Sequence, residues 1–192
     1  GIKTCLDLYQ KPPDFLERIF GKNGTNLYIS LHSHDRFNTS EFEENPKSVG
    51  HSYTLPWASQ NPGFIRAWIR LLAEMVAQRL RHKNLVSQTT HLWLSRPESS
   101  GFGAQKTFQQ ATNDGHEIYH RCLKIMARTG LKTPKIRALG VSCSNLCFNQ
   151  YIPLFKEQKR REELIKAMDR INNRYGDGSI YPAVVTLTRK MA

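Results

Sequence analysis

The chain has 192 residues, with 28 Lys and Arg against 16 Asp and Glu, so its formal net charge is +12. Hydrophobic residues make up 39%, which is enough for a core of ordinary size and too much for a disordered chain. No run of about 18 apolar residues exists, which excludes a transmembrane helix, and no secretory-signal pattern opens the chain. The four cysteines do not make a dense disulfide framework, so we expect a reducing compartment.

The positive charge lies in one part of the chain. Residues 1–46 carry five Lys and Arg and seven Asp and Glu, whereas residues 47–192 carry 23 and nine, a net charge of +14. Such an excess favours a polyanion as partner, and nucleic acid is the commonest polyanion. A generally basic, solvated surface is the alternative.

Residues 1–31 have the pattern of short helices. Pro12-Pro13-Asp14 opens one of them, and the stretch Gly21 to Gly24 ends it. The expected helical turns cover 5–9 (capped by Thr4), 15–20 and 25–31. Residues 32–46 are polar and predict a linker, with solvated side chains at His32 and His34.

From residue 47 onward, strand and helix patterns alternate. The alternating β-formers predict strands over 48–55, 85–95, 104–111 and 135–148, and the helical apolar spacing predicts helices over 64–82 and 116–129. This order predicts an α+β fold, a split β-α-β-β-α-β four-stranded sheet with both helices on one face and the other face open. An apolar segment over 150–155, a charged helix over 156–175 and a last strand over 179–188 follow.

Enzymatic motifs are weak in this chain. The sequence His116-Glu117-Ile118-Tyr119-His120 matches H-E-x-x-H, in which two His bind zinc and the Glu acts as a base. The match lies in the first turn of a helix, where Glu117 suits the helix dipole, and no third ligand follows at a known spacing. We therefore expect no metal site and no catalytic residue, with a zinc hydrolase as an alternative. Cys143 and Cys147 are expected to be small buried residues on one face of a strand.

Four segments of the chain resemble one protein family. Gly1-Ile2-Lys3-Thr4-Cys5 with Asp7-Leu8, then Phe20 to Gly24, looks like the end of the thumb domain of Y-family translesion DNA polymerases. Lys47 to Pro56 resembles the first strand of their little-finger domain, and Arg137 to Leu146 resembles its last core strand. Ala167 to Gly176 resembles the C-terminal helix of the UmuC-type branch. The matches fall in the family's order, so the chain is similar to the C-terminal part of a bacterial UmuC-like polymerase of the ImpB/MucB/SamB family.

The resemblance implies a domain organisation and a function. Residues 1–31 would be a helical thumb remnant, 32–46 a linker, 47–149 a little-finger DNA-binding domain, and 150–192 a clamp-motif-like segment with a C-terminal extension. The catalytic palm lies before this region in the family, so we expect no polymerisation by this chain alone and no cofactor in it. The parent would use Mg²⁺ and deoxynucleoside triphosphates at its palm. It would act in translesion synthesis during the SOS response, in the bacterial cytoplasm at the nucleoid.

The expected partner is primer-template duplex DNA, gripped mainly through its phosphates because a lesion polymerase must tolerate any sequence. The resemblance assigns these contacts to residues on three strands and on the truncated thumb hairpin. They are Lys47, Ser48, Gly50, His51, Lys106, Thr107, Lys135, Arg137, Ile2 and Lys3.

A second partner is the bacterial sliding clamp. Residues 150–155 resemble clamp-binding peptides, in which Leu and Phe enter an apolar pocket, and Pro153 favours an extended chain. The resemblance assigns clamp contacts to Gln150, Tyr151, Ile152, Leu154 and Phe155. The alternative is that Ile152 and Phe155 pack on their own domain.

Two other functions remain open. A stand-alone nucleic-acid-binding module would use the open sheet for RNA or single strands, and it would need Phe108 and Trp93 exposed on that face. A pure interaction module would have the clamp as its main partner.

Overall fold

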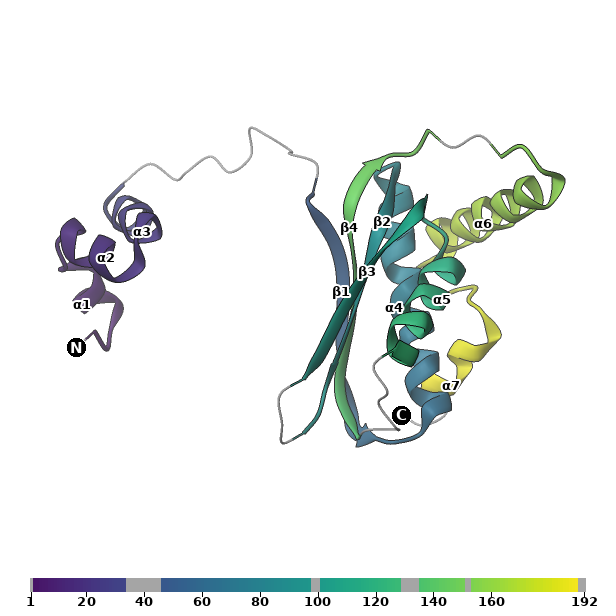
Figure 1. Ribbon diagram of the computed structural model, residues 1–192, viewed down its shortest axis with the longest axis horizontal. Helices are drawn as coiled ribbons and strands as arrows, with labels where there is room; N and C mark the ends of the chain where they lie inside the picture. Colours follow the sequence, from purple (N-terminus) through teal and green to yellow (C-terminus); the bar gives the residue numbers. More distant parts are fainter. Residues whose placement is uncertain (1, 34–45, 98–100, 129–134, 151–152, 190–192) are drawn as a thin grey trace. The chain divides into compact units, whose positions relative to one another are not determined.

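The computed structural model describes residues 2–33, 46–97, 101–128, 135–150 and 153–189 (Figure 1). The chain forms two compact units, Gly1–Asn45 and Pro46–Ala192. The division falls where the sequence changes from acidic to basic composition.

Three short helices make up the described part of the first unit: α1 (Cys5–Tyr9), α2 (Pro13–Phe20) and α3 (Lys22–His32). The predicted cap of α1 is confirmed, since Thr4 Oγ1 accepts a hydrogen bond from the Asp7 N–H and Asp7 Oδ2 accepts one from the Thr4 N–H. The expected break from Gly21 to Gly24 is wrong. Gly21 alone makes the turn, with φ of 58°, and α3 begins at the next residue.

The side chain of His32 is not solvated in a linker, contrary to the expectation. Its ring stacks on Tyr9 and on Tyr28, with both centroid distances at 4.1 Å. Its Nδ1 lies 3.0 Å from the Tyr28 carbonyl oxygen. The polar stretch therefore begins only after α3, and His34 lies outside the described residues.

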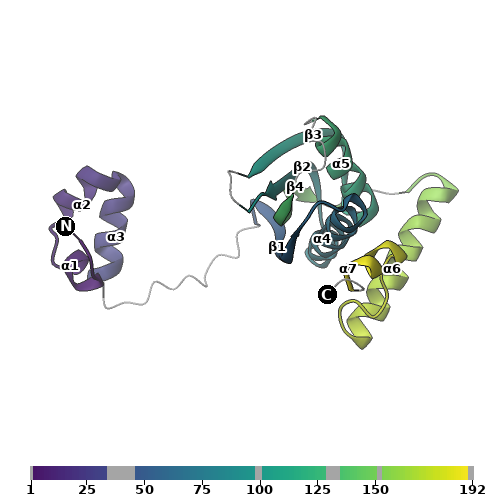
Figure 2. The same ribbon diagram turned by 90° about the horizontal axis from the view of Figure 1, so that it is seen from below.

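The second unit is built on a four-stranded sheet. Its elements are β1 (Ser48–Ser59), α4 (Pro62–His82), β2 (Leu85–Ser95), β3 (Phe102–Thr112), α5 (Gly115–Arg128) and β4 (Ile136–Phe148). The strand order is β1-β4-β2-β3, and every neighbouring pair is antiparallel. Because β4 lies between β1 and β2, the first β-α-β unit is split, and α4 and α5 cover one face of the sheet (Figure 2). The predicted α+β fold class is confirmed.

β1 is longer than the sequence predicts. The strand predicted over 48–55 does not end at Leu55 but continues through Pro56 to Ser59, with a register shift between Thr54 and Ser59. A proline is tolerated there because β1 is an edge strand, where its missing N–H breaks no bond of the ladder.

The core of this unit lies between the sheet and the two helices. One face of α4 is apolar along its whole length, and α5 adds a shorter apolar stripe. The central members of this core are Ile69, Leu72, Val76, Leu80, Ile118, Cys122, Leu92, Leu139 and Val141. Their spacing is three to four residues on the helices and two on the strands, as the sequence analysis expects.

The C-terminal part differs from the expectation at its end. Helix α6 (Lys156–Tyr175) is confirmed, but the last strand, over 179–188, is wrong. A short 3₁₀ helix, η1 (Ala183–Val185), and α7 (Thr186–Arg189) stand there and pack on α4. The β-branched composition favours a strand, but the outer side of α4 offers no strand with which this segment could pair.

Replacing Gly24 by Ala should destabilise the first unit. A Cβ at this position would overlap the Leu16 carbonyl oxygen and lie 2.8 Å from the Glu17 nitrogen, so α2 and α3 would have to separate. We expect a cost of about 1–3 kcal/mol, seen as earlier melting of the α2 and α3 amide signals in NMR spectra of the full chain. The exposed neighbour Asn23→Ala is the control, and equal melting of the two variants would contradict the packing argument.

Candidate nucleic-acid interface

The face of the sheet turned away from α4 and α5 is lined by small and hydroxyl side chains. Successive residues of a strand project to opposite faces, and the buried Val49, Leu92 and Val141 define the helix-covered face. The open set is Ser48, Gly50, Ser52 and Thr54 on β1, Ala138, Gly140, Ser142 and Ser144 on β4, Thr89, His91, Trp93 and Ser95 on β2, and Gly103, Gln105 and Thr107 on β3. None of these residues is Lys, Arg, Asp or Glu.

A hollow of about 340 Å³ lies on this open face, across β1, β4 and β2. Its lining is Gly50, His51, Ser52, Gly140, Val141, Ser142, His91 and Trp93. The His51 and Val141 side chains project to the helix side, so these two residues line the hollow with their backbone. Glycine at position 50 keeps the hollow open, since a Cβ there would lie only 2.8 Å from Ser142 Cβ.

Because side chains alternate along a strand, the predicted DNA-binding residues lie on both faces of the sheet. Ser48, Gly50 and Thr107 lie on the open face, where Thr107 Oγ1 is 2.9 Å from Thr89 Oγ1. His51 and Lys106 project to the helix-covered side. Burial, together with the nearby Arg79 guanidinium, lowers the pKa of His51, so its imidazole is neutral at pH 7.

The other predicted contacts lie at chain positions that border the sheet or belong to the first unit. Lys47 and Lys135 are exposed and come directly before β1 and β4. Arg137, the second residue of β4, is half-buried, and its Nη1 is buried without a hydrogen-bond partner among the described residues. Ile2 and Lys3 are exposed in the first unit, where the Lys3 N–H donates to Asp7 Oδ2. Contact with DNA stays a prediction for the whole set.

The two aromatic residues required by a base-stacking module lie on opposite sides of the sheet. Trp93 is on the open face and is 36% exposed. Phe108 is on the helix-covered side, where Lys106 Nζ and Arg121 Cζ lie 5.2 Å and 4.5 Å from its ring centroid. The stand-alone module needs both rings on the open face, and the position of Phe108 does not meet this condition.

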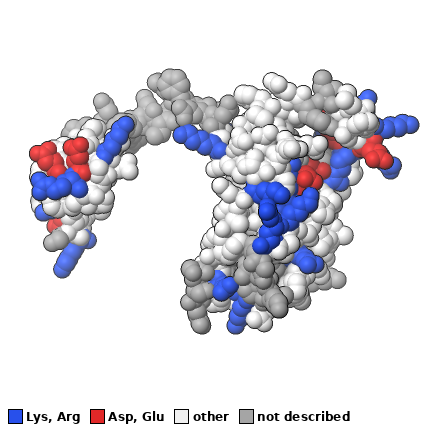
Figure 3. Space-filling model, viewed as in Figure 1, with Lys and Arg blue, Asp and Glu red and all other residues white. Residues whose placement is uncertain are grey.

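Exposed cations gather at the β3–α5 edge of this unit. Lys124 and Arg128 are exposed on α5, and Lys106 lies on the adjacent strand. Figure 3 shows Lys and Arg side chains grouped over the position of β3 and α5. One group of exposed cations thus borders the sheet, while the open face carries no Lys, Arg, Asp or Glu.

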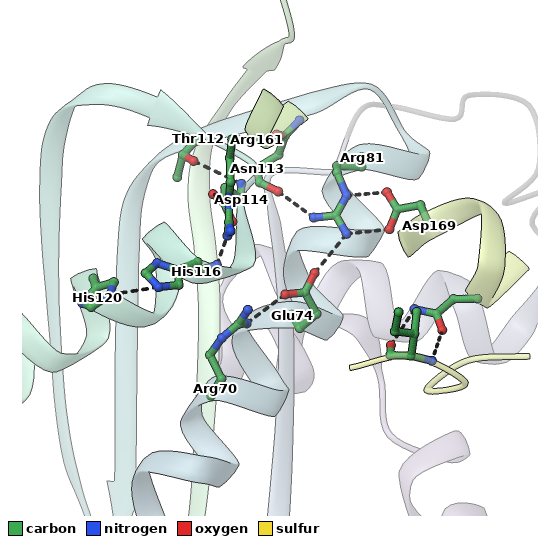
Figure 4. A network of polar contacts seen from close by, with 12 residues as sticks. Arg70, Glu74, Arg81, Thr112, Asn113, Asp114, His116, His120, Arg161 and Asp169 are labelled. Carbon is green, nitrogen blue, oxygen red and sulfur yellow. Dashed lines mark hydrogen bonds and ion pairs between the residues drawn. The ribbon is translucent and has the colours of Figure 1, made fainter. Parts of the chain in front are cut away.

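A row of ion pairs joins α4, the β3–α5 turn and α6 (Figure 4). Arg81 donates to both carboxylate oxygens of Asp169 at 2.6 and 2.7 Å and to Glu74 at 3.1 Å. Arg161 of α6 donates to both carboxylate oxygens of Asp114 at 2.8 and 2.9 Å. No residue of α6 is buried, and the two arginine–aspartate pairs link this helix to α4 and to the β3–α5 turn.

The electrostatics of the β3–α5 turn favour this attachment. Burial works to raise the pKa of Asp114, but hydrogen bonds from Arg161 and from the His116 N–H hold that pKa below its usual value. The bond to Asp114 in turn raises the pKa of Arg161. Sequence reasoning missed this pair because the two residues are 47 positions apart and no local spacing links them.

The H-E-x-x-H motif forms a histidine pair on α5. His116 Nε2 and His120 Nε2 are 3.3 Å apart, and Glu117 pairs with Arg121 at 3.1 Å. Within the residues that the structure describes, no group of three or more His, Cys, Asp or Glu is arranged for a metal ion. The zinc alternative therefore lacks a third ligand there.

The two cysteines of β4 differ in burial, and the expectation that both are buried is wrong. Cys143 lies in the core, where burial raises the pKa of its thiol, whereas Cys147 is exposed. The reason is a break in the alternation of β4. Asn145 has a φ of 53°, and the next residue, Leu146, packs against the core in place of Cys147.

Comparison with protein families decides the relationship. Residues 46–160 match the family model described as the impB/mucB/samB family C-terminal domain. The chain belongs to this family. The match covers β1 through the beginning of α6, which is the unit with the open sheet, and the resemblance seen in the sequence is confirmed.

Relatives of this impB/mucB/samB chain are named as DNA polymerases or repair proteins. DNA polymerase IV of Pelotomaculum thermopropionicum is 29% identical over 187 residues, covering 96% of this chain and 46% of the relative. The putative UV-damage repair protein UvrX of Bacillus subtilis is 30% identical, covering 96% and 46%. DNA polymerase IV 2 of Halalkalibacterium halodurans is 30% identical, covering 100% and 48%. The chain spans about half the length of the curated relatives it matches.

A solved Y-family DNA polymerase chimera has a TM-score of 0.49 and 18% identity, covering 78% of this chain and 42% of that chain. Among the described residues of this impB/mucB/samB chain, no helix has both the length and the apolar character needed to cross a membrane.

The segment of this impB/mucB/samB chain that resembles a clamp-binding peptide is exposed where it is described. Leu154 and Phe155 are 79% and 68% exposed, directly before α6. Gln150 is exposed as well, whereas Tyr151 and Ile152 lie outside the described residues. The alternative in which Phe155 packs on its own domain does not agree with this exposure.

Replacing Asp169 by Asn should loosen α6 without affecting the sheet. The variant removes the charge that receives two hydrogen bonds from Arg81 and leaves Arg81 bound to Glu74 and to the Asn113 carbonyl oxygen. We expect roughly tenfold faster hydrogen exchange in α6, from a loss of about 1.5 kcal/mol, with β2 and β4 unchanged. The exposed Glu163→Gln on the same helix is the control. Equal exchange in α6 of the Asp169→Asn variant and the original chain would rule out this attachment.

Proposed function

We propose that this chain is the DNA-binding C-terminal region of a translesion DNA polymerase and that it grips primer-template duplex through phosphate contacts. The observation that carries the proposal is a sheet with one uncovered face, bordered by exposed cations, in a chain whose relatives are named as DNA polymerases. Cations at the border can neutralise phosphates, while the small residues between them let the backbone approach the duplex.

The contacts we propose combine charged and uncharged groups. Lys47, Lys135 and Arg137 would meet phosphates at the ends of the strands, and the hydroxyls of Ser48 and Thr107 would donate to phosphate oxygens. Hydrogen bonds of this kind carry no base information, which suits a polymerase that must accept damaged templates. Ile2 and Lys3, in the first unit, would follow the minor groove.

The chemistry of nucleotide addition would belong to the rest of the parent protein. We propose that the palm carboxylates, with Mg²⁺ and deoxynucleoside triphosphates, lie outside this chain, so that the chain alone binds DNA without extending a primer. A role in the SOS response and a place at the bacterial nucleoid belong to the same proposal.

A salt series tests the grip on DNA. In fluorescence-anisotropy titrations with a labelled primer-template duplex, we expect a log–log slope equivalent to roughly 4–8 released counterions, with little dependence on sequence. Neutralising Lys47, Lys135 and Arg137 together should weaken binding about tenfold or more and lower the slope by about 3.

The matched control removes the same charge elsewhere, by neutralising Lys159, Arg160 and Lys166 on α6. It should lose much less affinity than the sheet-border variant. Equal losses in the two variants would mean that general charge attracts the DNA, and no binding even at low salt would overturn the proposal.

Sliding-clamp docking is a second candidate function, favoured by the exposure of Leu154 and Phe155. Replacing both by Ala should abolish binding to a purified bacterial sliding clamp in surface plasmon resonance, because the two apolar side chains would supply most of the buried area. DNA affinity should stay unchanged. The control replaces Leu164 and Ile171, two exposed residues of α6, by Ala. If the original chain does not bind the clamp, this candidate function is ruled out.

A further inference from the structure

Trp93 lies on the open face between glycines on both neighbouring strands. Its cross-strand partners are Gly140 on β4 and Gly103 on β3. A Cβ on Gly140 would lie 3.3 Å from Trp93 Cε3, and a Cβ on Gly103 would lie 3.8 Å from Trp93 Cδ1. The benzene end of the indole thus points toward β4 and the pyrrole end toward β3.

The close approach of the ring to glycine positions on both neighbouring strands indicates that the indole leans over the sheet with one flat face outward. Glycine at the flanking positions makes this possible, because larger side chains would push the ring upright. A Cβ on Gly101 would lie 3.1 Å from the indole Nε1, which is a third close approach of glycine to the same ring. The 36% exposure of Trp93 is therefore available as a stacking surface.

The surroundings of this surface suit an uncharged planar ligand. The side chains that line the hollow carry no Lys, Arg, Asp or Glu. Hydrogen-bonding groups stand beside the indole, including Ser52 and the pair formed by His91 Nδ1 and Ser142 Oγ, 3.5 Å apart. A volume of about 340 Å³ is near the lower end of ordinary small-molecule sites, and it suits one base rather than a duplex.

We propose that this hollow, with Trp93 as its platform, is a stacking site for one extrahelical nucleobase of the DNA held on the sheet. The proposal rests on the proposed DNA-binding function and adds a preference to it. A base within a duplex is stacked on both faces and cannot reach the indole, so the occupant is a base that has left the stack, such as a bulged template nucleotide. Phosphates bind at the charged border of the sheet, and the neutral hollow receives the base.

The test compares two labelled duplexes of equal length, one fully paired and one with a single unpaired template nucleotide. In anisotropy titrations of the full chain at one salt concentration, the bulged duplex should bind roughly fivefold to tenfold more tightly. Trp93→Ala should abolish this preference, and Trp93→Phe should retain part of it. Trp57→Ala, which removes another exposed indole of the same unit, should leave the preference unchanged.

A second readout locates the base. With 2-aminopurine as the bulged nucleotide, stacking on the indole should quench its emission when the original chain binds, and the Trp93→Ala variant should not quench it. Binding of both duplexes with equal affinity, or equal weakening of both by Trp93→Ala, would overturn the stacking site and leave the proposed function in place. Failure to bind either duplex at low salt would overturn both.

Discussion

Apolar side chains of α4 and α5 bury one face of the sheet, and this burial determines what the opposite face presents. Leu92, Leu139 and Val141 point into the core. Since a strand has a period of two, the residues between them, such as Gly140 and Ser142, must project to the other side. The arrangement of the open face therefore follows from the packing of the core, and a shift of one residue in register would exchange the two faces.

Charged and uncharged side chains occupy different parts of the surface of the second unit. The open face holds hydroxyls, glycines, one alanine, one glutamine, one imidazole and one indole, whereas exposed cations such as Lys47, Lys135 and Lys124 stand at strand ends and on the β3–α5 edge. A surface of this kind can attract a polyanion from its border without fixing it at the centre. That separation is the reason why we assign different parts of the DNA to the border and to the hollow.

Helix α6 is attached through ion pairs, whereas α4, α5 and the sheet are held together by apolar packing. Two arginine–aspartate pairs hold it, Arg81 with Asp169 and Arg161 with Asp114, and none of its residues is buried. Partly exposed ion pairs contribute less than an apolar core and weaken with salt, so α6 should open locally at a lower free energy than the sheet. The exposed residues Leu154 and Phe155 come directly before this less stable helix.

Local patterns in the sequence were enough to predict the order of the elements from β1 to α6 and the family of the chain. Each element carries its own period, such as the apolar spacing of 64–82 for a helix and the alternation of 85–95 for a strand, and the family motifs are contiguous. Other features depend on the tertiary structure and could not be predicted from local patterns. They are the exposure of Cys147, the stacking of His32, the helical end of the chain and the attachment of α6. In each case the deciding neighbour is far away along the chain or on another element, and a local pattern holds no information about such a neighbour.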